Sequence, residues 1–458
     1  MSLTSCLSDL LDRSCAGAFA QRRTRERAAE LALGMLCSFG RRTISRAICA
    51  LGRQSGDWSA DYKLYSRSPW RAEMLFEPVL RAYLERYPAG PIRAAMDDTK
   101  LARTGRRIKT AFWQRDPLSP PFHANLIYGL RFMQTSLLFA HYREGNFSAR
   151  SMPVRFTECP ALKKPGKRAT PQEREAYREA RKQKNLSRQG LEEIRALRRH
   201  LDGLGAAGRV LIEAVDGSLC NRTIYREAIE RVALVGRCRK DARLCFAAPA
   251  GSRRKYGAAC FTPESVRQDP AIPWRRARIF FGGAWRKIRY KEVKAVLWRR
   301  GAGTRPLRLL AIAPVPYRLS PNARIHYGEP SYLLATDLKS SAKVLLQCYF
   351  DRWQIEVNHR EEKDIMGVGQ AQVWSAQSVP RQPAFAVAAY SLLLLAGLMA
   401  FGPGRTDDFV ALPKWRKKAK RPSALDLLTL LRKEINETPI CDPTHRQMPR
   451  NLVNYAYT

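Results

Sequence analysis

Four residues in the C-terminal third of the chain have the types and spacing of a site that handles phosphate: Tyr349, Arg352, Glu356 and Lys363. Successive steps of three, four and seven residues return a helical side chain to nearly the same bearing, so one polar stripe would carry all four. A carboxylate flanked by two cations and a phenol suits a site that holds a metal ion and binds phosphate. The same spacing also fits an amphipathic helix with solvated charge pairs. An adjoining apolar stripe would pack this helix, and it consists of Leu346, Phe350, Trp353 and Val357.

Further acids close two apolar runs that are typical of strands. Residues 92–99 (IRAAMDDT) lead to Asp97 and Asp98, and residues 209–216 (RVLIEAVD) end on Asp216. Carboxylates from separate elements, without His or Cys ligands nearby, favour Mg²⁺ or Mn²⁺ over zinc. Two such ions about 4 Å apart could activate a nucleophile and stabilise the leaving oxygen of an in-line phosphoryl displacement. The plainer alternatives are a capping role for Asp97 and an Asp-Gly turn at Asp216.

The chain is strongly basic, which predicts a polyanionic partner. Its 458 residues include 81 Lys and Arg against 41 Asp and Glu, a net charge of +40. Because so much like charge destabilises a compact protein, we expect nucleic acid as the partner first and an anionic membrane second. Cations are concentrated in residues 163–199 and 414–421. Both runs also fit a solvated helix surface or a disordered tail.

The cysteines and the longest apolar segment bear on the compartment. Eleven Cys without a C-x-x-C pair or a Cys/His ligand spacing argue against a disulfide framework and a zinc site, and they favour a reducing cytosol. The first residues lack the pattern of a secretory signal. Residues 384–401 run eighteen positions without a charge, which is borderline for a membrane span and equally typical of a buried helix. We expect a buried helix and no membrane.

The remaining patterns predict an α/β protein that begins with a helical segment. Residues 1–88 are expected to be helical, and two helices at 25–37 and 43–51 flank a glycine-containing turn. This arrangement resembles a helix-turn-helix that binds DNA, and its exposed cations would be Arg41, Arg42 and Arg46. The alternative is a plain helical bundle.

The rest of the chain divides into further segments. Strand patterns dominate residues 89–236, with a hairpin or two neighbouring strands at 124–140 and a charged helix at 170–200. Residues 237–335 are rich in β-branched and aromatic residues between glycines and prolines, which predicts a β-rich insertion. Helices return in residues 336–404. A basic C-terminal region, 405–458, is expected to be partly disordered apart from a helix at 424–433.

The chain resembles the DDE-type transposases of bacterial insertion sequences, in the group whose third acid lies in a Tyr-x₂-Arg-x₃-Glu-x₆-Lys (YREK) signature. Tyr349, Arg352, Glu356 and Lys363 match this signature without a gap. The segment Asp97-Asp98-Thr99 is similar to the first acidic motif of the family. The segment Val215-Asp216-Gly217, with Asn221, is similar to the second. The resemblance covers roughly residues 20 to 400.

This resemblance implies an RNase H-like central mixed sheet with helices, formed by residues 89–236 and 336–404. Asp97 and Asp216 would lie on adjacent strands, Glu356 would arrive from a helix, and the three would be catalytic ligands of two Mg²⁺ or Mn²⁺ ions. Arg352 and Lys363 would contact phosphates near the scissile bond, and Tyr349 would orient the backbone or a neighbouring ligand. The implied enzyme cuts DNA at transposon ends and then joins the 3′-hydroxyl to target DNA. Its expected partners are terminal inverted repeats, target DNA and a second copy in a synaptic homodimer, and its expected location is the nucleoid-associated cytoplasm.

Two departures from the family pattern leave alternatives open. The first acid is followed by Asp-Thr-Lys, where the family has Gly or Asp-Thr-Gly, so Asp98 rivals Asp97; we favour Asp97. The second motif lacks the usual Arg and aromatic residue, and Gly217 and Leu219 stand there instead. The alternative function is therefore a catalytically inactive or domesticated DNA-binding protein that keeps the fold.

Overall fold

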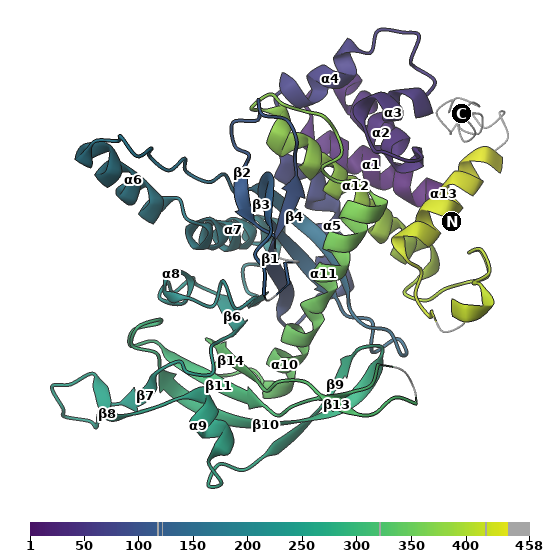
Figure 1. Ribbon diagram of the computed structural model, residues 1–458. Helices are drawn as coiled ribbons and strands as arrows, with labels where there is room; N and C mark the ends of the chain where they lie inside the picture. The colour runs from purple at the N-terminus through teal and green to yellow at the C-terminus, as the bar shows by residue number, and fades with distance from the viewer. Residues whose placement is uncertain (117–118, 121, 320–321, 417–418, 438–458) are drawn as a thin grey trace.

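The N-terminal part of the protein is helical. The computed structural model describes residues 1–116, 119–120, 122–319, 322–416 and 419–437 (Figure 1). Hydroxyl side chains begin two of the first helices, because Ser2 accepts from the Ser5 N–H and Thr43 accepts from the Arg46 N–H. The helical elements here are α1 (Leu3–Ala18), α2 (Arg22–Cys37), α3 (Ile44–Ala50), α4 (Ser59–Ser66), the 3-10 helix η1 (Ala72–Phe76) and α5 (Glu77–Arg86). The predicted glycine turn between α2 and α3 contains Gly40 at a φ of 64°.

A mixed sheet forms the centre of the molecule. Three strands pair antiparallel in the order β4–β3–β1, and β1 then pairs parallel with β5, which pairs parallel with β6. The strands are β1 (Ile92–Ala102), β2 (Phe112–Arg115), β3 (Leu126–Phe139), β4 (Arg150–Glu158), β5 (Leu211–Val215) and β6 (Val232–Arg237). The predicted α/β class is confirmed. The hairpin expected at residues 124–140 is wrong: β3 is one long strand, paired with β1, β2 and β4.

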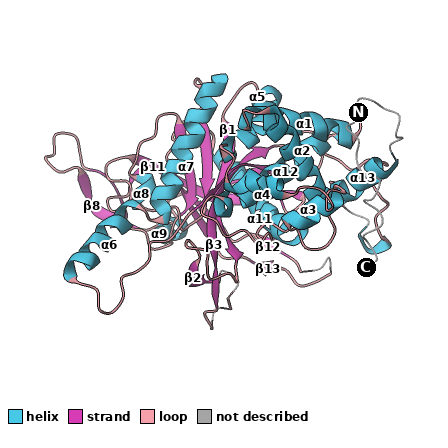
Figure 2. Ribbon diagram, turned by 90° about the horizontal axis from the view of Figure 1, so that it is seen from above, coloured by secondary structure: helices cyan, strands magenta, loops and turns pink. Residues whose placement is uncertain are grey.

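The charged segment between β4 and β5 is helical. Its elements are α6 (Pro171–Gln183), α7 (Leu186–Leu201) and the π-helix η2 (Asp202–Ala206), and α8 (Arg222–Tyr225) follows β5. The helix α7 is amphipathic and packs against the sheet through Leu191, Ile194, Leu197 and Leu201, all fully buried. Figure 2 shows α7 on one side of the strands, and α11, α12 and the N-terminal helices on the other.

The segment predicted to be β-rich consists largely of strands, and these extend the central sheet. Its elements are β7 (Leu244–Ala247), β8 (Tyr256–Phe261), α9 (Pro263–Gln268), β9 (Arg275–Phe281), β10 (Ala284–Leu297), β11 (Pro306–Ile312), β12 (Pro316–Tyr317), β13 (His326–Tyr327) and β14 (Ser331–Ala335). Because β14 pairs antiparallel with β6, the described strands other than β12 and β13 form one twelve-stranded sheet. Gly282 and Gly283 turn the β9–β10 hairpin with φ of 59° and 74°, a region that favours glycine.

Helices complete the chain. They are α10 (Ala342–Asp351), α11 (Trp353–Arg360), the π-helix η3 (Glu361–Ile365), α12 (Ser378–Phe401), the 3-10 helix η4 (Lys414–Arg416) and α13 (Ala424–Glu437). The helix α12 is long and apolar enough to cross a membrane, but 83% of its most apolar window is buried, against α1, β4 and neighbouring helices. The prediction of a buried helix is thus confirmed. Part of the predicted basic C-terminal region, residues 417–418 and 438–458, lies outside the described residues.

Candidate active site

The pairing of two parallel strands brings Asp97 and Asp216 side by side. The paired residues of β1 and β5 end with Met96 opposite Val215. Asp97 is the next residue of β1, and Asp216 directly follows the end of β5. Equivalent positions of neighbouring parallel strands lie at the same edge of the sheet, so the two carboxylates lie side by side there. The sequence suggested that Asp97 ends its strand, but the strand continues past it. The strand β1 continues to Ala102 because β3 remains paired with it after β5 has stopped.

The structure separates Asp97 from its neighbour Asp98. Successive strand residues point to opposite faces, and the carboxylate of Asp98 accepts a 2.7 Å hydrogen bond from Arg131 Nε on β3. The carboxylate of Asp97 instead faces the C-terminal helices, where its Oδ2 lies 3.0 Å from Arg352 Nη1. Its Oδ1 accepts from the Asp98 backbone N–H at 2.8 Å. Of the two acids, Asp97 is therefore the one that contacts Arg352.

The guanidinium of Arg352 joins three acids that are far apart in the sequence. Its Nη1 contacts Asp97, and its Nη2 lies 3.1 Å from Glu356 Oε1 and 3.8 Å from Asp216 Oδ1. We call Asp97, Asp216 and Glu356 the acid cluster. The Arg352 side chain is 11% exposed, whereas Asp216 is 41% exposed. The cluster is therefore closed on the arginine side and open to solvent on the Asp216 side.

The signature spans three consecutive helical elements, which are α10, α11 and the π-helix η3. Ser341 caps α10, which ends at Asp351; Arg352 keeps helical angles (φ −51°, ψ −32°), and α11 follows at once. Arg352 and Glu356 thus keep the i,i+4 relation that the sequence predicts. The predicted apolar stripe holds only in part. Leu346 is fully buried, but Trp353 is 60% exposed, so it does not pack the helix.

The two other signature residues lie at either end of this arrangement. The Tyr349 ring centroid is 5.8 Å from Arg352 Cζ, and burial raises the pKa of the phenol. Lys363 lies beyond Glu356 in the π-helix η3, where burial lowers its pKa and the charges of Glu362, Asp364, Asp116 and Asp98 raise it. Tyr349 therefore borders the acid cluster, while Lys363 faces a second group of acids around Asp98.

The electrostatics of the acid cluster favour a cation. Burial, together with the charges of Asp216 and Asp98, raises the pKa of Asp97 to about 7, although Arg352 lowers it. Burial also raises the pKa of Glu356, again against the effect of Arg352. One guanidinium therefore does not neutralise three partly buried carboxylates. The acid cluster can therefore accommodate a further positive group.

The donor set fits a hard divalent cation, but not without movement. Carboxylate oxygens are the ligands that Mg²⁺ and Mn²⁺ prefer, and the acid cluster supplies three carboxylates. Within the described ranges, no group of three His, Cys, Asp or Glu side chains stands ready as a metal-binding cluster. In the acid cluster the cation that the carboxylates contact is the guanidinium of Arg352. Metal binding would thus require this side chain to turn away.

Comparison of the sequence with protein-family models and with curated proteins gives no match. The geometry of the acid cluster is therefore the main support for any functional conclusion.

The predicted DNA contacts of the N-terminal helices are only partly exposed. Arg41 and Arg46 are exposed at the turn and on α3. Arg42 is not: it is 7% exposed, and its Nη1 donates to the Met35 carbonyl at 3.0 Å. Its backbone N–H donates to Gln370 Oε1, and its Nη2 donates to the Ile365 carbonyl. Arg42 therefore connects the turn to the segment after α11, and it is not among the exposed cations of this turn.

Sequence reasoning missed a buried polar network behind the signature helix. Tyr390 on α12 donates to Glu361 Oε2 at 2.5 Å and accepts from Asn358 Nδ2 at 2.9 Å. Beside it, Glu362 is 1% exposed, and burial raises its pKa to about 8 although Gln134 donates a hydrogen bond to it. The repeated acids at 361 and 362 were visible in the sequence. Their burial was not, because it depends on α12 and β3.

Proposed function

We propose that this protein is a DDE-type transposase of an insertion sequence. It would cut DNA at transposon ends and join the freed 3′-hydroxyl to target DNA. The observation that carries the proposal is the convergence of Asp97, Asp216 and Glu356 on one guanidinium. Two of these acids come from adjacent parallel strands and the third from a helix, which is the arrangement that the YREK resemblance implies.

The sheet supports an RNase H-like fold as part of the same proposal. Three antiparallel strands continue into two parallel strands, the first acid lies on β1, and the second follows the neighbouring β5. The net charge of +40 supports DNA as the partner, because a polyanion would offset the repulsion among so many cations. Terminal inverted repeats and a synaptic homodimer in the nucleoid-associated cytoplasm belong to this proposal through the resemblance alone.

The roles of the residues follow from their positions. Asp97, Asp216 and Glu356 would hold one or two Mg²⁺ or Mn²⁺ ions, which supply an activated oxygen nucleophile and charge stabilisation of the leaving oxygen. Arg352, once released from the carboxylates, is placed to bind a phosphate beside the cut. Tyr349 limits the directions in which Arg352 can turn. Lys363 would bind phosphate further along the strand.

The departures in the second motif leave the carboxylates untouched. Leu219, which stands where the family has an aromatic residue, is fully buried in the core. Gly217 is exposed, and a Cβ added there would make only an ordinary contact, 3.4 Å from the Arg237 carbonyl oxygen. Leu219 therefore serves core packing, and neither departure moves an acid out of the cluster.

Cleavage of DNA that carries the element's own terminal repeats tests the proposal. We expect Mg²⁺- or Mn²⁺-dependent nicking, and a loss of about 10³-fold or more in Glu356→Gln, because ligand loss removes several kcal/mol of charge stabilisation. Glu85→Gln, at an exposed position on α5, is the matched control and should cut normally. Equal cutting by Glu356→Gln would exclude this site. Binding of the repeats without cutting at any metal concentration would favour the inactive alternative.

A further inference from the structure

A charged arm leaves the body of the protein between β4 and α7. It comprises residues 161–184 and contains α6, which projects from the body in both ribbon views (Figures 1 and 2). None of the thirteen residues of α6 is buried. The helix is therefore formed without any packing surface of its own, unlike α7, which follows it and buries seven residues.

Local interactions specify α6 but cannot hold it strongly. The Thr170 hydroxyl accepts from the Glu173 N–H at 3.2 Å, and the Glu173 carboxylate accepts from the Thr170 N–H at 2.8 Å, which completes a capping box. Exposed pairs join Glu175 to Arg178 and Glu179 to Lys182. Such exposed pairs contribute little to stability, and isolated helices shorter than about 12–15 residues are marginal in water. A partner surface would stabilise this helix.

The charge on the arm indicates what that partner is. Residues 161–184 contain nine Lys and Arg against three Glu. All three acids are already used, one in the capping box and two in the exposed pairs. Among the described residues, the remaining cations with no acidic partner and no side-chain hydrogen bond are Lys163, Lys164, Lys167, Arg168, Arg181 and Lys184. The arm therefore presents unneutralised positive charge to solvent over its whole length.

The arm lacks what a membrane surface would need. A helix that binds at a lipid interface inserts an apolar face of residues such as Leu, Phe or Trp. The sequence of α6, PQEREAYREARKQ, has Tyr177 as its only large ring and no Leu, Ile, Val, Met, Phe or Trp. A duplex phosphate backbone, in contrast, needs only exposed cations in a row.

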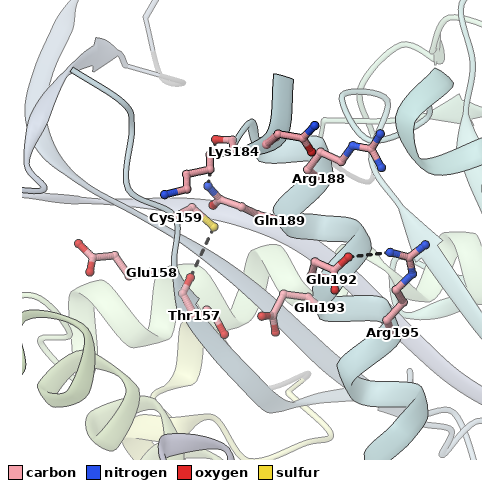
Figure 3. A pocket seen from close by; sticks show the side chains of 10 residues that line it. Thr157, Glu158, Cys159, Lys184, Arg188, Gln189, Glu192, Glu193 and Arg195 are labelled. Carbon is pink, nitrogen blue, oxygen red and sulfur yellow. Dashed lines mark hydrogen bonds and ion pairs between the residues drawn. The ribbon is translucent and has the colours of Figure 1, made fainter. Parts of the chain in front are cut away.

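The joint between arm and body contains a cavity lined largely by charged and polar residues. A cavity of about 420 Å³ separates the start of α7 from the end of β4, and its lining includes Lys184, Arg188, Glu158 and Cys159 (Figure 3). The side chain of Asn185 links the two helices, because it accepts from the Arg188 N–H at 3.0 Å and donates to the Lys182 carbonyl at 3.0 Å. The arm is therefore joined to α7 through hydrogen bonds at its base, next to a solvent-accessible cavity.

We propose that residues 161–184 form a DNA-binding arm that contacts the phosphate backbone of duplex DNA away from the acid cluster, and that this contact stabilises α6. The inference rests on the proposed function only in taking DNA as the polyanion. It adds a substrate-binding surface that cleavage chemistry does not require. The cations at its base and tip would contact phosphates, while the capping box keeps the helix in register.

The salt dependence of DNA binding by the full chain tests the arm. The arm variant changes Lys163, Lys164, Lys167 and Arg168 to Gln, and its binding to duplex DNA is measured in EDTA, where no cleavage occurs. Each phosphate contact contributes about 0.9 to the slope of log K against log salt. We expect the slope to fall by about 3 to 4. The matched control changes four exposed cations elsewhere, Lys294, Arg300, Lys339 and Lys343, and should lose much less.

Hydrogen exchange of the full chain tests the second half of the proposal. Amides of residues 171–183 should exchange rapidly in the free protein and become protected by duplex DNA. Inorganic phosphate and phosphatidylglycerol vesicles should give no such protection. Equal slope losses in the arm variant and the control would overturn the proposal, as would protection by vesicles and not by DNA. Because binding is measured in EDTA, a protein that never cuts DNA can still confirm or refute the arm.

Discussion

Three carboxylates share the guanidinium of Arg352, which neutralises them only in part. This sets how the metal affinity of the site depends on pH. The pKa of Asp97 is raised to about 7, chiefly by burial. Only the ionised carboxylate binds a divalent ion, so binding expels the proton that Asp97 holds below pH 7. We expect the affinity for Mn²⁺ to rise about tenfold per pH unit between pH 5.5 and 7 and to level off above. Isothermal titration calorimetry over this range measures it.

The same shift affects stability without metal. Because the folded pKa lies above the unfolded value, the folded state holds its proton longer, and the free energy of unfolding falls as pH rises from about 4 to 7. Saturating Mn²⁺ should reverse this fall. Asp97→Asn should make this fall smaller without abolishing it, because burial also raises the pKa of Glu362. Asp98→Asn, whose partner is Arg131, should change it less. A Mn²⁺ affinity independent of pH in the wild-type protein would contradict the raised pKa.

Arg352 is expected to oppose metal binding. Its guanidinium contacts all three acids, and removing one partner from a buried ionic cluster costs about 3–5 kcal/mol. Arg352→Gln should therefore lower the free energy of unfolding without metal, by about 3 kcal/mol, and Mn²⁺ should restore much of it. The affinity for Mn²⁺ should rise by about tenfold or more, since a positive charge within about 4 Å is lost.

Urea unfolding and titration calorimetry separate this role from a positioning role. Arg360→Gln is the matched control, because Arg360 lies exposed at the end of the same helix α11. If Arg352→Gln bound Mn²⁺ more weakly than the wild-type protein, the arginine would hold the acids in place for the metal and would not compete with it.

At the scale of elements, the sequence predicts the individual strands and helices of the site better than their pairing and their ends. The acids at 97 and 216 follow apolar strand patterns, and parallel strands carry them to one edge, so their meeting could be expected. The continuation of β1 past Asp97 could not, because it depends on pairing with residues of β3 that lie 27 or more positions further along the chain. For the same reason the pattern at 124–140 suggested a hairpin, although β3 is one strand.

The signature helix illustrates a second limit. Spacings of three, four and seven predict an α-helix, and Arg352 and Glu356 obey this. The chain then widens into the π-helix η3, whose Met366 N–H donates to the Glu361 carbonyl five residues back. Nothing in the local periodicity signals this step. It coincides with the burial of Glu361 and Glu362 against α12 and β3, which are contacts made by distant segments.

The buried network around Tyr390 should stabilise this π-helix. Tyr390→Phe removes a hydrogen bond to the carboxylate of Glu361 and one from Asn358, and both groups are buried. A buried polar group left without its partner costs about 1–3 kcal/mol. We expect the free energy of unfolding in urea to fall by that amount. Tyr62→Phe, at a 40% exposed position on α4, removes the same hydroxyl and should change stability little. Equal effects would show that the network contributes nothing.

At the scale of the whole molecule, two predictions from the sequence concern segments whose role depends on their neighbours in the fold. The sequence predicts a β-rich insertion at residues 237–335, and pairing of β14 with β6 joins this segment to the central sheet. The apolar helix looked borderline for a membrane, yet α12 lies inside the protein. It packs on β4 and also contacts α1 and α13, which come from opposite ends of the described chain. An apolar surface all round the helix follows from neighbours on every side.

This position predicts that α12 governs the stability of the entire fold. Leu393 is fully buried in α12, whereas Met399, six residues later in the same helix, is 48% exposed. Leu393→Ala creates a cavity and should lower the free energy of unfolding by about 2–5 kcal/mol. Met399→Ala removes a comparable apolar side chain from an exposed site and should cost far less. Urea unfolding without detergent measures both. If α12 instead faced lipid, the two variants would unfold alike and the protein would require detergent to stay in solution.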